Sequence, residues 1–303
     1  MAKAPRSLAG QVVVITGAAR GIGRATAVAL IAQGARVAIG DIEGPLAERT
    51  ASELGGGCVG LALDVTDQSS FAAFLDEVEM RLGPLDVLIN NAGIMPIGPF
   101  VEETEATARR MVDINLHGVI FGSKLALARF TPRRRGHLVN VASIAGKVGV
   151  PHDVTYCATK FAVVGLTESL KAEYAGSGIQ FSVVMPVGVN TELYSGLPKP
   201  RGMPVPEPED VADAVVDALQ KGIFDVYVPK RLAATVRLSA LLPRRGAEAL
   251  GRAFKSDKAL INPDHTARAA YEARMNATIY GSQPEIPASA EVIPAEEPAR
   301  EAV

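Results

Sequence analysis

The sequence predicts an α/β protein: a doubly wound parallel sheet of about seven strands, with helices on both faces and a helical C-terminal extension. Short apolar runs rich in β-branched residues recur along the chain, which is typical of strands buried on both faces. Stretches with a helical pattern separate these runs, and this alternation favours a parallel sheet. The first run, 12–15, passes directly into a glycine-rich turn and then a helix. In that context a glycine turn can bind a phosphate.

The same alternation of apolar runs and helical patterns predicts the elements in order. The expected strands are 12–15, 36–41, 59–63, 85–89, 138–142, 180–185 and 225–229. The expected helices are 24–33, 46–54, 69–82, 105–130, 154–174 and 209–221, with Pro208 in the first turn of the last one. In such a sheet the ligand lies beyond the carboxyl ends of the strands. Residues expected there, in one crevice, are Gly17, Asp41, Asp64, Asn91, Ser143 and Pro186.

Composition narrows the class of protein. A chain of 303 residues can hold one large α/β domain or two smaller ones, and 48% hydrophobic residues can fill a sizeable core. The net charge of -2 gives no reason to expect nucleic acid as a partner. Two cysteines suggest no disulfide framework, and the four histidines do not cluster, so we expect no metal site. No signal peptide or apolar run of membrane length is evident, so we expect a cytoplasmic protein.

The glycine turn, Thr16 to Gly23, is expected to approach a dinucleotide. Its spacing is G-x-x-x-G-x-G, and a tight turn without ligand is the alternative. Asp41, at the end of the second strand, is placed to bind the adenosine ribose hydroxyls and to repel a 2′-phosphate, which favours NAD over NADP. Arg20 in the turn is a counter-signal, because its charge attracts that phosphate. An ordinary turn acid is the alternative for Asp41.

A tyrosine and a lysine four residues apart, Tyr156 and Lys160, lie on one face of the helix expected at 154–174. A free phenol has a pKa near ~10, and a neighbouring ammonium lowers the pKa of the phenol. The pair can therefore donate and accept a proton near neutral pH, although an exposed surface pair is the alternative. Asn115 lies in the middle of the expected helix 105–130, where Asn usually points to solvent.

Taken together, these motifs resemble those of the short-chain dehydrogenase/reductase family. The stretches that carry the resemblance are Thr16 to Gly23, Asn90 to Gly93, Asn115, Ser143, and Tyr156 to Lys160, in the family's order, within a region from about Leu8 to Pro229. The resemblance implies a Rossmann-type catalytic domain over residues 1–229. It also implies hydride transfer between a nicotinamide cofactor and an alcohol/ketone pair.

The resemblance further implies residue roles. Tyr156 would exchange a proton with the substrate oxygen, Lys160 would lower the pKa of that tyrosine, Ser143 would hydrogen-bond the substrate, and Asn115 would hold a water in the proton relay. The cofactor would be bound by Gly17, Arg20, Gly21, Ile22, Gly23, Asp41, Asp64, Val65, Asn91, Ala92, Gly93, Tyr156, Lys160, Pro186, Val189 and Thr191. One departure stands out: Val187 follows Pro186 where the family usually has Gly, which we expect to narrow the space beside the nicotinamide or to shift the loop.

Beyond the catalytic domain, residues 191–210 are expected to form a proline-rich lid over the substrate. Residues 230–280 are expected to form a helical extension packed on the same domain, and 281–303 a disordered tail. Packed amphipathic helices, a lid over an apolar substrate and peripheral membrane contact remain open for the extension. The expected function is an NAD-linked oxidoreductase for an alcohol/ketone pair with an apolar substrate. A non-catalytic dinucleotide sensor and an epimerase or dehydratase are the alternatives. The expected assembly is a homodimer or homotetramer.

Overall fold

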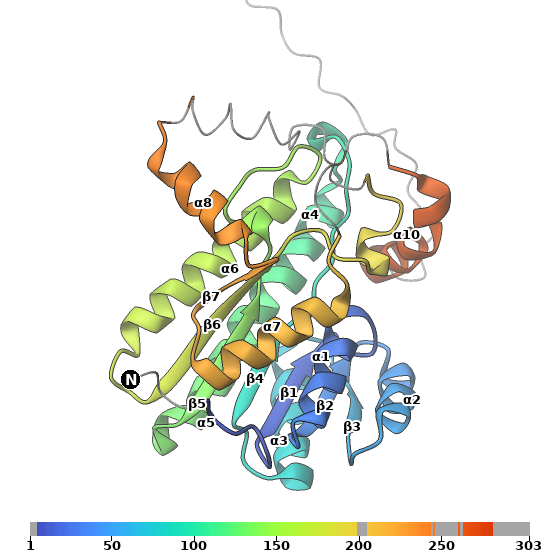
Figure 1. The fold of residues 1–303 in the computed structure, drawn as a ribbon. Helices are drawn as coiled ribbons and strands as arrows, with labels where there is room; N and C mark the ends of the chain where they lie inside the picture. The colour runs from blue at the N-terminus through green and yellow to red at the C-terminus, as the bar shows by residue number, and fades with distance from the viewer. Residues whose placement is uncertain (1–4, 199–204, 244, 246–259, 261–262, 281–303) are drawn as a thin grey trace, which may run out of the picture.

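A computed structural model describes residues 5–198, 205–243, 245, 260 and 263–280. Within these residues seven parallel strands form one sheet in the order β3-β2-β1-β4-β5-β6-β7 (Figure 1). The strands are β1 (Val12–Thr16), β2 (Arg36–Asp41), β3 (Val59–Ala62), β4 (Val87–Asn90), β5 (Gly136–Val141), β6 (Ile179–Pro186) and β7 (Asp225–Val228). The fold class and all seven strands expected from the sequence are confirmed.

Helices cover both faces of the sheet. The α-helices are α1 (Gly21–Ala32), α2 (Gly44–Leu54), α3 (Gln68–Leu82), α4 (Glu105–Val112), α5 (Gly118–Arg133), α6 (Val154–Glu173), α7 (Pro208–Lys221), α8 (Leu232–Leu241) and α10 (His265–Tyr280). Short turns are η1 (Phe100–Glu102), η2 (Asp113–His117), η3 (Ile144–Gly146) and η4 (Glu192–Tyr194).

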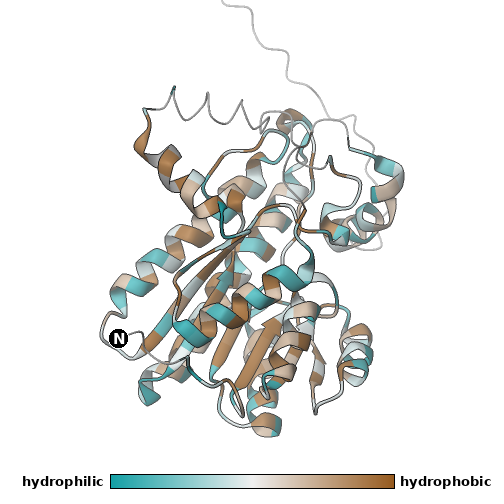
Figure 2. Cartoon of the chain, in the orientation of Figure 1, coloured by the Kyte–Doolittle hydropathy of each residue, from teal (hydrophilic) through white to brown (hydrophobic). Residues whose placement is uncertain are grey.

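Two apolar layers sandwich the sheet, because successive side chains of a strand point to opposite faces. In β1, Val13 and Ile15 pack with the face covered by α1 and α7, whereas Val12 and Val14 pack with the face covered by α3 and α5. All four side chains are buried, and the strands form the apolar centre of the molecule in Figure 2. The continuous apolar runs in the sequence follow directly from this double burial.

The expected helix 105–130 is not continuous, which corrects the sequence analysis. It divides into α4, the π-helical segment η2 and α5, and Asn115 lies within η2. The side chain of Asn115 is fully buried rather than solvent-facing. Its amide bonds the main chain of Ile94, and a wider π turn is a recurrent way of placing such a residue inside a helix at a functional site.

The C-terminal extension contacts the domain at two places. Leu232 of α8 packs in an apolar cluster with Tyr227 of β7, while α10 lies against α4 and η4 (Figure 1). Residues 246–259 and the expected tail 281–303 lie outside the described residues. Within the described part of the chain, every helix is too short or too polar to span a membrane.

Candidate active site

The glycine loop joins β1 to α1 in a conformation that requires glycine. Gly17 and Gly21 have φ angles of 62° and 55°, in the left-handed region. A Cβ atom on Gly23 would lie 2.7 Å from the Cα of Ala18 and 2.8 Å from the Gly17 oxygen. The loop is thus held tightly against the start of α1, and the unpaired N–H groups of a helix N-terminus can bind a phosphate. Ile22 lies in the first turn of the same helix.

Asn91, at the end of β4, ties this loop to its neighbour. Its side-chain amide donates to the oxygens of Thr16 and Gly17 at 2.9 and 3.0 Å. The Thr16 hydroxyl accepts from the main-chain nitrogens of Asn91 and Ala92, both at 3.0 Å. Asn91 therefore orders adjacent strand ends.

Asp41 ends β2 beside the glycine loop. One carboxylate oxygen accepts from the Ala19 nitrogen and the other from the Glu43 nitrogen, both at 3.2 Å. Arg20 does not stand as a free cation in the loop. Its guanidinium lies 2.8 Å from the carboxylate of Glu43 and 3.8 Å from that of Glu192.

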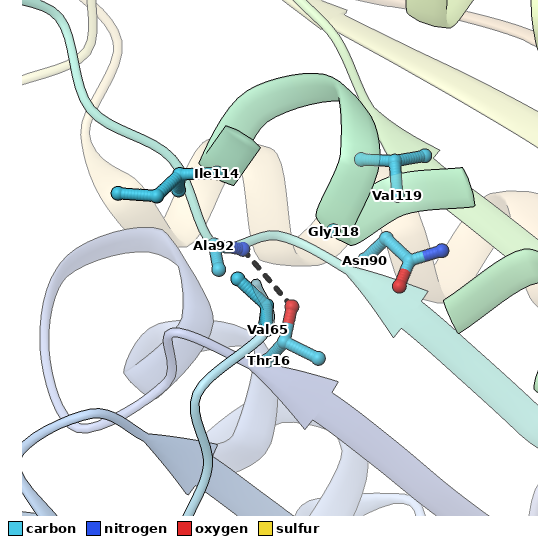
Figure 3. A pocket seen from close by; sticks show the side chains of 7 residues that line it. All are labelled: Thr16, Val65, Asn90, Ala92, Ile114, Gly118 and Val119. Carbon is cyan, nitrogen blue, oxygen red and sulfur yellow. Dashed lines mark hydrogen bonds between the residues drawn. The ribbon is translucent and has the colours of Figure 1, made fainter. Parts of the chain in front are cut away.

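A small pocket lies where β1, β4 and the η2–α5 junction meet (Figure 3). Its lining residues are Thr16, Val65, Asn90, Ala92, Ile114, Gly118 and Val119. Val65, one of the residues that the resemblance assigns to the cofactor, forms one wall. The neighbouring Asp64 carboxylate accepts from the Thr66 nitrogen at 2.9 Å and from its hydroxyl at 2.7 Å, which fixes the turn.

Asn115 holds the loop that follows β4. The Ile94 nitrogen donates to Asn115 Oδ1, and Asn115 Nδ2 donates to the Ile94 oxygen, both at 2.9 Å. This closed pair fixes the preceding Gly93. A Cβ atom there would lie 3.2 Å from Asn115 Oδ1 and 3.6 Å from Lys160 Nζ, so Asn115, Gly93 and Lys160 meet at one point.

Tyr156 and Lys160 lie in α6 on one buried face, with exposures of 7% and 4%. Lys160 Nζ lies 5.4 Å from the centre of the Tyr156 ring and donates to the oxygen of Val141 at 3.0 Å. Val141 ends β5, and Ser143 follows two residues later. The Ser143 hydroxyl accepts from the Ala145 nitrogen at 3.1 Å. The structure therefore brings Tyr156, Lys160, Ser143 and Asn115 together, with both helix residues out of water.

Burial governs the charges in this group. It raises the pKa of Tyr156 well above its usual value; Asp153 raises it further, and a hydrogen bond with Ser143 lowers it. Burial also lowers the pKa of the Lys160 ammonium to about 8, against an opposing effect of Asp153. Desolvation thus opposes the acidic phenol that the Tyr156–Lys160 spacing predicts.

The segment after β6 carries the remaining cofactor candidates. Pro186 ends the strand, Val189 is buried, and Thr191 lies beside the glycine loop, where a Cβ on Gly21 would be 3.6 Å from its methyl group. Val187 continues the strand pairing by donating to the Val228 oxygen at 3.0 Å. Its side chain packs in the cluster that includes Met185 and Tyr227, so it extends the core beneath α8.

Three residues near Tyr156 have no counterpart in the sequence analysis: Asp153, Arg268 and Tyr271. Arg268 in α10 is fully buried and donates to the oxygens of Leu193, Ser195 and Met95 at 2.8, 3.2 and 2.7 Å. The Met95 nitrogen donates to the Tyr271 hydroxyl at 2.8 Å. Arg268 and Tyr271 of the extension therefore both bond Met95, which follows Ile94, the residue bonded by Asn115. A helical pattern alone gave no signal for this contact.

Comparison with known proteins identifies the family. Residues 11–201 match the family model of the short chain dehydrogenases. The chain belongs to the short-chain dehydrogenase/reductase family. It is 44% identical over 158 residues to the inactive 2-(S)-hydroxypropyl-CoM dehydrogenase 2 of Xanthobacter autotrophicus, covering 52% of this chain and 69% of the relative. It is 41% identical over 191 residues to the sorbitol dehydrogenase of Cereibacter sphaeroides, covering 63% and 75%.

A solved structure shows the same fold. A short-chain dehydrogenase/reductase from Burkholderia phymatum, crystallised in complex with NAD, superposes with a TM-score of 0.71 at 27% identity. The match covers 78% of this chain and 94% of that one. Family membership and this neighbour support a nicotinamide-dependent oxidoreductase. Among the described residues, no group of His, Cys, Asp and Glu is placed to hold a metal ion.

Proposed function

We propose that this protein is an NAD-linked oxidoreductase that interconverts an alcohol and a ketone, with Tyr156 as the proton donor and acceptor. The observation that carries the proposal is the convergence of Tyr156, Lys160 and Ser143 at the edge of the sheet that also bears the glycine loop. The nicotinamide would supply hydride transfer when bound. A buried phenol beside an ammonium and a hydroxyl can balance that transfer with a proton.

Each residue has a distinct part in the proposal. Ser143 holds the substrate oxygen near the phenol, and Lys160, anchored on Val141, keeps positive charge below the ring. The Asn115 amide is occupied by Ile94, so Asn115 acts as a positioning residue. We assign the water of the proton relay to its main-chain oxygen, within the π segment.

NAD rather than NADP is proposed from the charges beside the ribose site. Asp41 places a carboxylate there, and Glu43 pairs with Arg20, the one loop cation that otherwise favours a 2′-phosphate. Glu192 lies on the other side of Arg20. The net field at this point is therefore negative, which disfavours a second phosphate.

An apolar substrate is proposed from the walls around Tyr156. Met95, Leu197 and Leu260 are buried in one cluster with it, and Leu193 and Val150 pack against that cluster. Sorbitol, for which one relative is named, is a polyol. Turnover of apolar alcohols and of polyols of matched size tests this proposal, and we expect the apolar alcohols to react faster.

Assembly into a homodimer or homotetramer is proposed through α5 and α6. Phe161 and Val154 on α6 are each 46% exposed, which places apolar area on the outer side of the catalytic helix. Light scattering of the purified chain gives the mass directly, and a monomer at micromolar concentration would contradict this assembly.

The test of function is NADH absorbance with a panel of secondary alcohols and ketones, comparing the wild type with Tyr156→Phe. We expect the variant to bind NADH as before and to lose about 10²- to 10⁴-fold in turnover. One relative is named as inactive, which is the kind of protein that the alternative of a non-catalytic dinucleotide sensor describes. This chain has the serine, tyrosine and lysine that the chemistry needs. Full activity of Tyr156→Phe would reject the tyrosine as the proton donor.

A further inference from the structure

Asp153 stands directly before α6, where an aspartate usually caps the helix by accepting a main-chain N–H. Its side chain makes no such bond. It is 4% exposed, and its Oδ1 atom is buried without a hydrogen-bond partner. Asp153 therefore does not stabilise the start of α6 as a cap. Its unpaired Oδ1 atom also lowers the stability of the folded protein.

The carboxyl group lies within electrostatic reach of the reaction centre. The titratable groups that face it are Tyr156, Cys157 and Lys160 from α6, Arg268 and Tyr271 from α10, and Glu103 from the turn before α4. Burial raises the pKa of Asp153 to about 7, Arg268 lowers it, and Glu103 raises it.

Arg268 does not satisfy this carboxyl group. Its two terminal nitrogens are committed to the oxygens of Leu193, Ser195 and Met95. Its Nε atom lies 3.5 Å from Glu272. In the described part of the chain, the ion pairs of Arg268 do not include Asp153. The guanidinium therefore fastens α10 over the site and leaves Asp153 available to another donor.

The position of Asp153 relative to Tyr156 indicates where that donor lies. Asp153 is the N-cap residue of α6 and Tyr156 is the third residue of the helix, two positions whose side chains are neighbours where a capping box forms. A substrate oxygen held at the Tyr156 phenol would therefore place the next carbon's substituent near Asp153. Met95 and Leu197, buried in the same cluster as Tyr156, present no side-chain donor on the opposite side.

We propose that Asp153 is a specificity-determining residue that accepts a hydrogen bond from a second hydroxyl group, on the carbon next to the one that is oxidised. The substrate class is then a vicinal diol, or the corresponding α-hydroxy ketone, with an otherwise apolar body. This rests on the proposed function, in which the bound nicotinamide would take up the hydride of the reacting alcohol and Tyr156, as its phenolate, would accept the hydroxyl proton. Asp153 itself gains and loses no bond in that step.

The test uses two alcohols of matched size, trans-cyclohexane-1,2-diol and cyclohexanol, with the cis diol as a stereochemical check. For each we measure kcat/KM with NAD, and, separately, binding by calorimetry to the full chain saturated with NADH. The wild type should favour a diol by about ten- to a hundred-fold, the range expected for a hydrogen bond to a charged group. Asp153→Ala should abolish that preference, measured as the ratio of kcat/KM for the diol to kcat/KM for cyclohexanol, because the effect of Asp153 on the pKa of Tyr156 and Lys160 applies to both alcohols. Asp153→Asn should keep a smaller part of the preference.

A thermal-unfolding measurement separates this role from a structural one. Because the carboxyl is buried and unpaired, Asp153→Ala should raise the midpoint, by about 2–4 °C. A capping aspartate would instead show a lower midpoint on the same substitution. A stabilised variant that no longer distinguishes the diol is the signature of a binding residue.

Two results would overturn the inference: a wild type that binds the diols no better than cyclohexanol, or an Asp153→Ala variant that keeps the diol preference. The failure of the proposed function looks different. In that case diol binding would depend on Asp153 while none of the alcohols reduced NAD.

Discussion

The cofactor side and the substrate side of the crevice are built in different ways. On the cofactor side, the glycine loop is fixed by close backbone contacts, and the side chains of Asp41 and Asn91 bond its main-chain atoms from the ends of neighbouring strands. On the substrate side, single side chains from distant parts of the chain make the contacts: Arg268 and Tyr271 reach Met95 across 173 and 176 residues. The first construction tolerates almost no change in backbone, whereas the second depends on a few replaceable side chains.

The largest effect should come from a methyl group on the cofactor side. Gly23→Ala would place a Cβ atom within 2.8 Å of two main-chain atoms, so the loop must shift. We expect NADH affinity to fall by about 100-fold, or ~2.7 kcal/mol, measured by fluorescence titration. Gly165→Ala in α6 meets nothing within 4 Å and should leave affinity unchanged. Equal losses in the two variants would contradict the comparison.

A smaller and differently placed effect is expected on the substrate side. Arg268→Met removes the donor to three main-chain oxygens and should loosen α10 and η4, because buried unsatisfied acceptors cost about 1–3 kcal/mol each. We expect KM for the alcohol to rise at least about ten-fold, with faster hydrogen exchange over 265–280 and unchanged NADH affinity. Arg274→Met, which breaks only an exposed pair with Glu192, is the matched control. A loss of NADH affinity as large as the rise in KM would show that the two sides are not separate.

Cofactor choice should respond to charge alone. Asp41→Asn removes the carboxylate and should shift the NAD-to-NADP ratio of kcat/KM by about ten-fold toward NADP, or ~1.4 kcal/mol. Glu43→Gln, which frees Arg20 from its 2.8 Å pair, should shift the ratio in the same direction by less. Steady-state kinetics with both cofactors measures this, and an unchanged ratio in both variants would remove the basis for the NAD assignment.

The last effect lies away from both sides, at the buried His137 of β5. Burial lowers its pKa to about 3, with a further contribution from Arg6. The unfolded chain therefore takes up a proton near pH 6.5 that the folded chain refuses. The stability gained by keeping this histidine neutral is complete above pH 6.5 and is lost as pH falls toward 3, at up to ~1.4 kcal/mol per pH unit.

Urea unfolding of the wild type and of His137→Gln, from pH 7 to pH 4.5, measures the pH-dependent contribution of His137 to the free energy of unfolding. The difference in unfolding free energy between the two should shrink or change sign as the pH falls. A difference that stays constant would show that His137 does not titrate on unfolding.

The contrast between the two sides also explains what could be predicted from the sequence. Strand β2 has the bounds expected for it, 36–41, because a buried parallel strand is a continuous apolar run closed by a polar residue. Gly17 and Asn91 carry recognisable spacings because main-chain geometry restricts which residues fit. The glycine loop and the tyrosine–lysine turn were therefore readable before any fold was known.

The rest left no pattern in the chain. A π segment such as 113–117 has no propensity of its own, so helix 105–130 looked continuous. Asp153 looks like an ordinary helix cap until its buried, unpaired oxygen is seen. Arg268 looks like one cation of an amphipathic helix, and only tertiary packing brings it against the main-chain oxygens of Leu193, Ser195 and Met95.

The most direct test of the central claim follows the hydride itself. A ketone that is reduced in the panel is incubated with NADH carrying deuterium at the nicotinamide C4, in each of the two stereochemical forms. The deuterium content of the alcohol formed is then measured by mass spectrometry. One form should deliver its deuterium to the product carbon, and Tyr156→Phe should deliver almost none in the same time. Alcohol formed without deuterium from either form, or no alcohol from any ketone while NADH stays bound, would contradict that claim.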